Sequence, residues 1–236
     1  MRENFSFYGY NPPTAGIYEI GGVKYFIGED FRTVKRYKEY KNVGFDILLL
    51  QHECAYNGED FETSVCKMCM DRAFKAGIDK IIVDDPRLKE LCEEPALTGS
   101  GGRFATDDEL LRYVSDCIAP YRNAKGFYGV QLRDEPDYKM LASYGKVCKA
   151  LRKVMPNIYL QCNLFPIAGL DFLAAAARDS FDAYEQYLRS FADESGEKSI
   201  CFDEYPYLRE YIFGVNSLRT YQIAAKVCKE KDLELR

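Results

Sequence analysis

The stretch GVQLRDEP, residues 129–136, decides the fold. An apolar segment with the character of a β-strand ends there in charged residues, and Pro136 stops it because proline has no N–H for a strand ladder. Successive side chains of a strand point to opposite faces, so Gln131, Arg133 and Glu135 share one face. The pattern predicts a strand at the mouth of a barrel, with Glu135 pointing into it.

The same arrangement recurs along the chain, because short apolar segments alternate with segments of helical periodicity. Strands are expected at 5–10, 46–51, 80–84, 126–133, 158–163 and 199–203. Helices are expected at about 31–43, 61–76, 107–122, 141–154, 181–195 and 215–231. Strands that alternate with helices of this length pair in parallel through right-handed crossovers.

Polar residues follow nearly every expected strand, which favours a (β/α)8 barrel of the α/β class over an open doubly wound sheet. About six βα units are recognisable, and DLELR at 232–236 indicates the approach to a seventh strand. We therefore expect one barrel domain spanning residues 1–236, incomplete because strands seven and eight are missing. A complete but non-standard α/β domain is the alternative.

The composition excludes several classes of function. The net charge of −5 and the absence of a basic cluster speak against a nucleic-acid partner, and no apolar run of about 18 residues predicts a membrane span. The N-terminus shows no signal peptide, so a cytoplasmic location is expected. The nine cysteines, including Cys66 and Cys69 in mid-helix, are expected to be reduced core thiols. With His52 as the only histidine, no metal site and no cofactor are expected.

Alternation on the other strands adds further inward-facing residues. Carboxylates, amides and tyrosines suit a polyhydroxylated ligand, because each sugar hydroxyl both donates and accepts hydrogen bonds. We expect a carbohydrate or glycoside substrate, with Glu135 and Asp203 as candidate catalytic groups. The expected substrate-binding residues are Tyr8, Tyr10, Gln51, Gln131, Arg133, Asn163 and Tyr205.

Three segments carry a family resemblance: GFYGVQLRDEP at 126–136, MPNIYLQCNLFP at 155–166 and SICFDEYPY at 199–207. Together they resemble the DEP-type glycoside-hydrolase-like (β/α)8 barrels, which are related to the clan-A retaining glycosidases. The resemblance implies hydrolysis of O-glycosidic bonds with Glu135 as acid/base. It places the nucleophile on the seventh strand, beyond the chain end, which leaves the activity of these 236 residues alone open.

The chain departs from this family's pattern in two further ways. Clan-A enzymes usually have Asn where this chain has Asp134, and they often have a Trp platform, whereas this chain has no Trp. Arg133, on the same face as Glu135, would lower the pKa that a general acid needs raised.

Other functions stay open. A Mg²⁺-dependent barrel enzyme would use Asp84 or Asp85, Glu135, and Asn163 or Asp203 as oxygen ligands. A non-catalytic carbohydrate-binding barrel would bind sugars without turnover. An incomplete barrel also has unpaired edges, so self-association is expected. The Gly-rich segment between residues 88 and 104 does not match a phosphate-binding loop and is expected to be a mobile loop.

Overall fold

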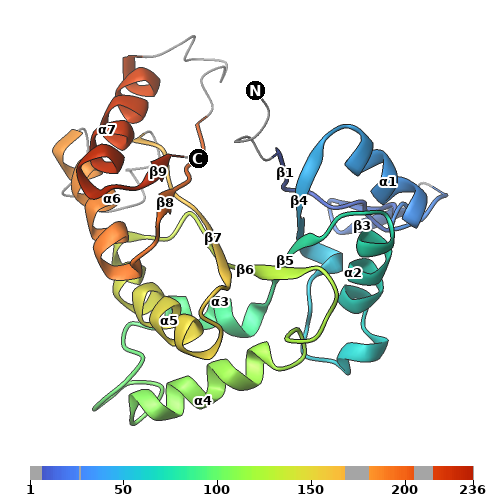
Figure 1. Cartoon of the computed structure of the whole chain (residues 1–236), viewed down its shortest axis with the longest axis horizontal. Helices are drawn as coiled ribbons and strands as arrows, with labels where there is room; N and C mark the ends of the chain where they lie inside the picture. The colour runs from blue at the N-terminus through green and yellow to red at the C-terminus, as the bar shows by residue number, and fades with distance from the viewer. Residues whose placement is uncertain (1–6, 27, 168–180, 205–214, 236) are drawn as a thin grey trace. The chain divides into compact units, whose positions relative to one another are not determined.

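The computed structural model describes residues 7–26, 28–167, 181–204 and 215–235 (Figure 1). The strands are β1 (Phe7–Gly9), β2 (Ile17–Ile20), β3 (Val23–Phe26), β4 (Phe45–Leu50), β5 (Lys80–Asp84), β6 (Phe127–Asp134), β7 (Tyr159–Asn163), β8 (Ser199–Ile200) and β9 (Glu234–Leu235). The α-helices are α1 (Val34–Asn42), α2 (Val65–Lys75), α3 (Pro86–Glu93), α4 (Asp107–Ile118), α5 (Leu141–Val154), α6 (Phe181–Ser195) and α7 (Val215–Lys231). Short 3₁₀ turns are η1 (His52–Cys54), η2 (Phe61–Thr63) and η3 (Tyr138–Met140).

The main sheet has the order β1-β4-β5-β6-β7, and its first three pairings are parallel. A parallel bridge between Leu164 and Phe202 continues the series, and β8 pairs in parallel with β9. Strands of a (β/α) barrel pair in chain order, whereas a doubly wound sheet reverses its order at a switch point. The predicted class is confirmed: the fold is that of an incomplete (β/α)8 barrel.

A β-hairpin and one α-helix were not predicted. The hairpin β2–β3 lies between β1 and α1, and its tight turn is Gly21–Gly22, with φ of 59° and 79°. Paired positive φ values are typical of a type I′ turn, so the two adjacent glycines were the available signal. Helix α3 occupies the first part of the segment expected to be a mobile loop. The rest of that segment folds back on itself, because Phe104 donates its N–H to Leu97 at 2.8 Å.

The chain packs as two compact units. Unit 1 comprises Met1–Arg87 and Asp116–Gln131, and unit 2 comprises Leu88–Ser115 and Leu132–Arg236. Strand β6 begins in unit 1 and ends in unit 2. The single barrel domain over residues 1–236 stays a prediction.

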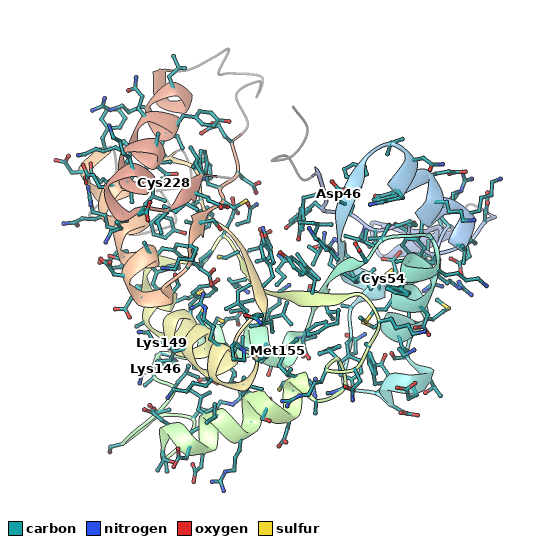
Figure 2. All side chains as sticks on the ribbon, in the orientation of Figure 1. Asp46, Cys54, Lys146, Lys149, Met155 and Cys228 are labelled. Atoms are coloured by element: carbon teal, nitrogen blue, oxygen red, sulfur yellow. The ribbon has the colours of Figure 1, made fainter. Side chains whose placement is uncertain are left out.

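Unit 1 buries the C-terminal parts of β4 and β5 and one face of α2. Cys66 and Cys69 of α2 are fully buried, and the thiol of Cys69 is hydrogen-bonded to that of Cys54, which is labelled in Figure 2. All nine cysteines are free thiols, and all but Cys201 are buried. The prediction that Cys66 and Cys69 face the core is therefore confirmed.

In unit 2, α5 packs against α6, and α6 packs against α7 (Figure 1). Gly145 of α5 allows a close approach, because a Cβ atom there would lie 2.4 Å from the carbonyl oxygen of Glu194 in α6. Arg152 at the end of α5 donates to the Ser195 carbonyl at 2.6 Å. In the described ranges, each helix is too short or too polar to cross a bilayer.

Candidate active site

Glu135 has an unusual backbone conformation at the end of β6. Its φ is 46°, in the left-handed region that residues other than glycine rarely adopt. The following Pro136 disfavours helical conformations at this position, which adds to the strain. Such strain costs about 1–3 kcal/mol and persists only where surrounding structure holds it, which is common at functional sites. Here the Glu135 N–H donates to the carbonyl oxygen of Asn163 at 2.7 Å.

The carboxyl group of Glu135 is half-buried, and burial is the main cause that raises its pKa. The negative charges of Asp134 and Asp203 raise the pKa further. A raised pKa keeps the carboxyl protonated at higher pH, as a general acid requires.

Arg133 does not counteract this effect. Its guanidinium forms a salt bridge with Glu93 at the end of α3, which balances the positive charge. Arg133 is not among the causes of the Glu135 pKa shift. The objection raised by the sequence, that Arg133 would lower this pKa, is therefore removed by a partner 40 positions away in the chain.

The segment after β7 connects the two candidate catalytic carboxylates. Asn163 accepts the Glu135 N–H, and Leu164 accepts the N–H of Asp203 at 3.1 Å. Leu164 also donates to the Cys201 carbonyl at 2.9 Å. These backbone contacts bring Glu135, Asn163 and Asp203 close together in the structure. Tyr205 lies outside the described residues.

Side chains of β7 and of Cys201, the residue after β8, form a polar row in unit 2. The Tyr159 hydroxyl donates to Gln161 at 3.0 Å, and Gln161 donates to the Cys201 sulfur at 3.8 Å. Cys201 in turn donates to Oδ1 of Asn163 at 3.3 Å. Alternation along the strands places these residues on one face, but it assigned Cys201 no role. The row therefore orients the side-chain amide of Asn163, the residue whose backbone carbonyl accepts the Glu135 N–H.

The remaining predicted binding residues lie in unit 1. The Gln51 amide donates to the Tyr10 carbonyl at 2.7 Å and to Oδ1 of Asn11 at 3.1 Å, so it holds the loop after β1. The Tyr8 and Tyr10 rings lie 6.4 Å apart between centroids. Gln131 is buried, and its Oε1 has no hydrogen-bond partner among the described residues. Their roles in substrate binding stay predictions.

Asp85, one candidate for a Mg²⁺ site, is already engaged. Its two oxygens accept hydrogen bonds from the Arg87 guanidinium at 3.0 and 2.6 Å, and one also accepts from the Tyr121 hydroxyl at 2.8 Å. Removing a carboxylate from a buried ion pair is costly, so this arrangement disfavours Asp85 as a metal ligand. Within the described ranges, no group of three or more His, Cys, Asp or Glu residues is placed to hold a metal.

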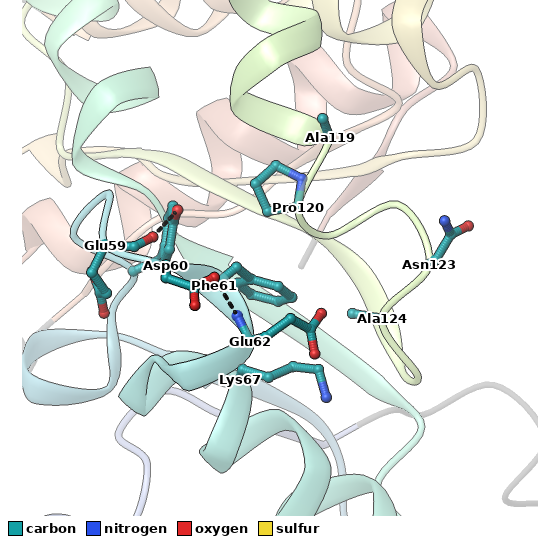
Figure 3. A pocket seen from close by; sticks show the side chains of 10 residues that line it. Glu59, Asp60, Phe61, Glu62, Lys67, Ala119, Pro120, Asn123 and Ala124 are labelled. Carbon is teal, nitrogen blue, oxygen red and sulfur yellow. Dashed lines mark hydrogen bonds between the residues drawn. The ribbon is translucent and has the colours of Figure 1, made fainter.

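A pocket of about 530 Å³ lies in unit 1 and contains none of the predicted site residues (Figure 3). Its lining residues are Tyr56, Glu59, Asp60, Phe61, Glu62, Lys67, Ala119, Pro120, Asn123 and Ala124. Asp60 accepts the Glu62 N–H at 3.3 Å, and Glu59 accepts the Asn57 N–H at 3.0 Å. These carboxylates therefore stabilise local turns, which is a structural role.

No protein-family profile matches the sequence, and no curated protein matches it. Solved structures do match over nearly the whole chain. One is a candidate alpha-L-fucosidase from Bacteroides thetaiotaomicron, with a TM-score of 0.61 and 11% identity, covering 98% of this chain and 72% of that one. Another is xylanase 10B from Thermotoga maritima, with a TM-score of 0.50 and 13% identity, covering 98% and 68% of the two chains.

A third is xylanase XynB from Paenibacillus barcinonensis, with a TM-score of 0.51, 12% identity, and coverage of 100% of this chain and 69% of that one. At these identities the likeness shows the fold alone. The chain shares the (β/α)-barrel fold of these proteins and spans roughly 70% of the length of each of the three.

Proposed function

We propose that this chain is a glycoside-hydrolase-like barrel in which Glu135 is the general acid for cleavage of an O-glycosidic bond. The observation that carries the proposal is the state of Glu135: it is strained, half-buried and raised in pKa at the end of a barrel strand. The likeness of the fold to two xylanases and a candidate fucosidase supports the same reaction class.

The chemistry follows from the two-carboxylate mechanism of retaining glycosidases. A protonated carboxyl gives its proton to the glycosidic oxygen while an ionised carboxylate about 5–5.5 Å away attacks the anomeric carbon. Glu135 supplies the proton. The family resemblance implies a nucleophile on the seventh strand of the barrel. The alternative is an inverting reaction, in which Asp203 activates a water and the two carboxyl groups lie about 6.5–9.5 Å apart.

The test is chemical rescue with azide, a small nucleophile that replaces a missing carboxylate. Aryl glycosides of several sugars and both anomers are incubated with the chain, with and without azide. Azide forms a bond to the anomeric carbon as the bond to the aryl oxygen breaks, and Glu135 gives its proton to the leaving aryl oxygen. A glycosyl azide of inverted configuration is the expected product of this chain.

Glu135→Gln is the decisive variant, and Glu62→Gln is the control at an exposed carboxylate of unit 1. We expect Glu135→Gln to lower turnover by about 10²–10⁴-fold for phenyl leaving groups and less for nitrophenyl groups, which need little acid assistance. Equal turnover of the variant and the parent chain would refute the role of Glu135. Saturable sugar binding without turnover would indicate the carbohydrate-binding barrel instead, and no binding at all would refute both functions.

A further inference from the structure

A buried tyrosine connects the two loops that hold Glu135. Tyr187 lies in α6 and is 1% exposed. Its hydroxyl donates a hydrogen bond of 2.8 Å to the carbonyl oxygen of Pro136. The same hydroxyl accepts a hydrogen bond from the backbone N–H of Phe165. One oxygen atom therefore links the loop after β6 to the loop after β7.

These two hydrogen bonds complete a ring of backbone contacts. The first link is the direct bond from the Glu135 N–H to Asn163 at 2.7 Å. The second passes from Pro136 through the Tyr187 hydroxyl to Phe165. Residues 135–136 are thus joined to residues 163–165 by two separate links. These links account for how Glu135 is held at a φ of 46° before a proline.

We propose that Tyr187 is a positioning residue that orients the Glu135 carboxyl relative to Asp203. Asp203 is anchored on Leu164, inside the same three-residue segment that Tyr187 holds. Without the hydroxyl, the loop of Pro136 keeps only the Glu135–Asn163 hydrogen bond to that segment, and the two carboxylates are held less tightly relative to each other. The effect on catalysis rests on the proposed function, whereas the effect on Glu135 itself does not.

Tyr184 offers a matched control in the same helix, one turn earlier. It is fully buried like Tyr187, and the two rings lie 6.3 Å apart between centroids. Its hydroxyl has no hydrogen-bond partner among the described residues. Tyr184→Phe therefore removes a buried hydroxyl from α6 without breaking a contact to either loop.

The first experiment measures the pKa of Glu135 by NMR of a chain labelled with ¹³C at its glutamate carboxyl groups, with Glu135→Gln assigning the signal. In Tyr187→Phe, we expect this pKa to fall toward the ordinary value of a glutamate, because a released carboxyl is better hydrated. In Tyr184→Phe, we expect no change. An unchanged Glu135 pKa in folded Tyr187→Phe would overturn the proposal.

Kinetics in the azide assay provide the second readout. We expect Tyr187→Phe to lower kcat by about 10–100-fold, because misplacement of a catalytic group by about 1 Å has this effect, while KM changes by less than about twofold. If the pKa shifts but Glu135→Gln keeps full turnover, the proposed function fails and the positioning role stands. If Glu135→Gln loses turnover but Tyr187→Phe changes neither kcat nor the Glu135 pKa, the positioning role fails.

A third measurement needs no variant, in case Tyr187→Phe does not fold. Hydrogen exchange of the parent chain reports directly on the two amides of the ring, those of Glu135 and Phe165. Both should exchange far more slowly than the amides of exposed loops, because each is held by a hydrogen bond at a buried acceptor. Exchange of the Phe165 amide at the rate of an exposed loop would overturn the ring.

Discussion

The backbone N–H of Glu135 donates to the carbonyl oxygen of Asn163 at 2.7 Å, and this contact joins the ends of neighbouring barrel strands. Glu135 itself has a positive φ, and the burial of its carboxyl group raises the pKa of that group. The candidate acid is therefore held by the strand after its own. Its protonation and its orientation depend on the same set of contacts.

The first prediction concerns stability against pH. Burial raises the pKa of Glu135 in the folded chain above its value in the unfolded chain, so folding favours the protonated form. This stabilisation is present below the unfolded pKa and is lost as pH rises through the folded pKa. Glu135→Gln cannot ionise, so its Tm relative to the parent chain should be higher at about pH 7 than at about pH 4. Calorimetry of the variant and the parent chain at both pH values checks this prediction. The same difference in Tm between the two proteins at both pH values would contradict it.

The second prediction concerns Asp134, an exposed carboxylate whose charge raises the pKa of Glu135. In Asp134→Asn, the Glu135 pKa should fall. A general acid loses its proton as pH rises through its pKa, and the alkaline limb of the pH–kcat/KM profile reports that pKa. The limb should therefore move to lower pH in this variant. Asp71→Asn, which changes an exposed carboxylate of unit 1, should leave the limb in place. A shift to higher pH would show that Asp134 acts in another way.

The third prediction concerns the buried ion pair of unit 1. Asp85 is fully buried, while the Arg87 side chain keeps 30% of its exposure. Asp85→Asn should lower the free energy of unfolding by about 3 kcal/mol, because it leaves a partly desolvated guanidinium without its charge partner. Asp71→Asn breaks the exposed pair with Lys67 and should cost under about 0.5 kcal/mol. Urea denaturation separates the two, and similar losses would be inconsistent with a structural role of Asp85.

The fourth prediction concerns helix packing in unit 2. Gly→Ala in an exposed helix stabilises it by about 0.5–1 kcal/mol, so helix propensity alone predicts that Gly145→Ala raises Tm. The new methyl group would instead lie 2.4 Å from the Glu194 carbonyl oxygen, and overpacking of this kind costs about 1–3 kcal/mol. We expect a lower Tm in thermal unfolding. A higher Tm would mean that α5 and α6 do not approach this closely.

The fifth prediction concerns self-association. Strand β9 pairs with β8, and the described ranges contain no strand beyond it. Near the chain end, Leu218, Tyr221 and Leu235 are exposed, and an unprotected strand edge is a template for pairing with another copy. Light scattering after gel filtration should show oligomers that increase with concentration. Leu235→Lys should shift the chain toward monomer, and a monomer at every concentration would rule this association out.

Much of the fold was predictable because its signals are local. The expected helices at 141–154, 181–195 and 215–231 coincide with α5, α6 and α7. The expected strand at 158–163 coincides with β7 within one residue. Helical periodicity and the alternation of short apolar strands are properties of single segments, so they can be read without knowledge of the tertiary structure. Helix α3 was missed because it sits in a segment whose glycines indicated a loop.

The candidate site was predictable only in part. Alternation along the expected strand named Glu135 rather than Asp134 as the candidate, since neighbouring side chains of a strand point to opposite faces. It could not predict that Arg133 pairs with Glu93, because that partner is 40 positions away. The same holds for Tyr187, which reaches Pro136 across 51 positions. Such contacts depend on which helix covers which loop, and no local pattern encodes this.

Local patterns in the sequence were enough to predict the alternation of strands and helices, their parallel order, and a carboxylate at the end of a barrel strand. Each of these follows from side-chain periodicity and from the backbone limits that proline and glycine impose. The left-handed φ of Glu135, the pairing of Arg133 with Glu93 and the direction of the Glu135 pKa shift arise only in the folded chain. The burial of a group and the charges near it depend on atoms that are distant in the sequence, so both are set only once the chain has folded.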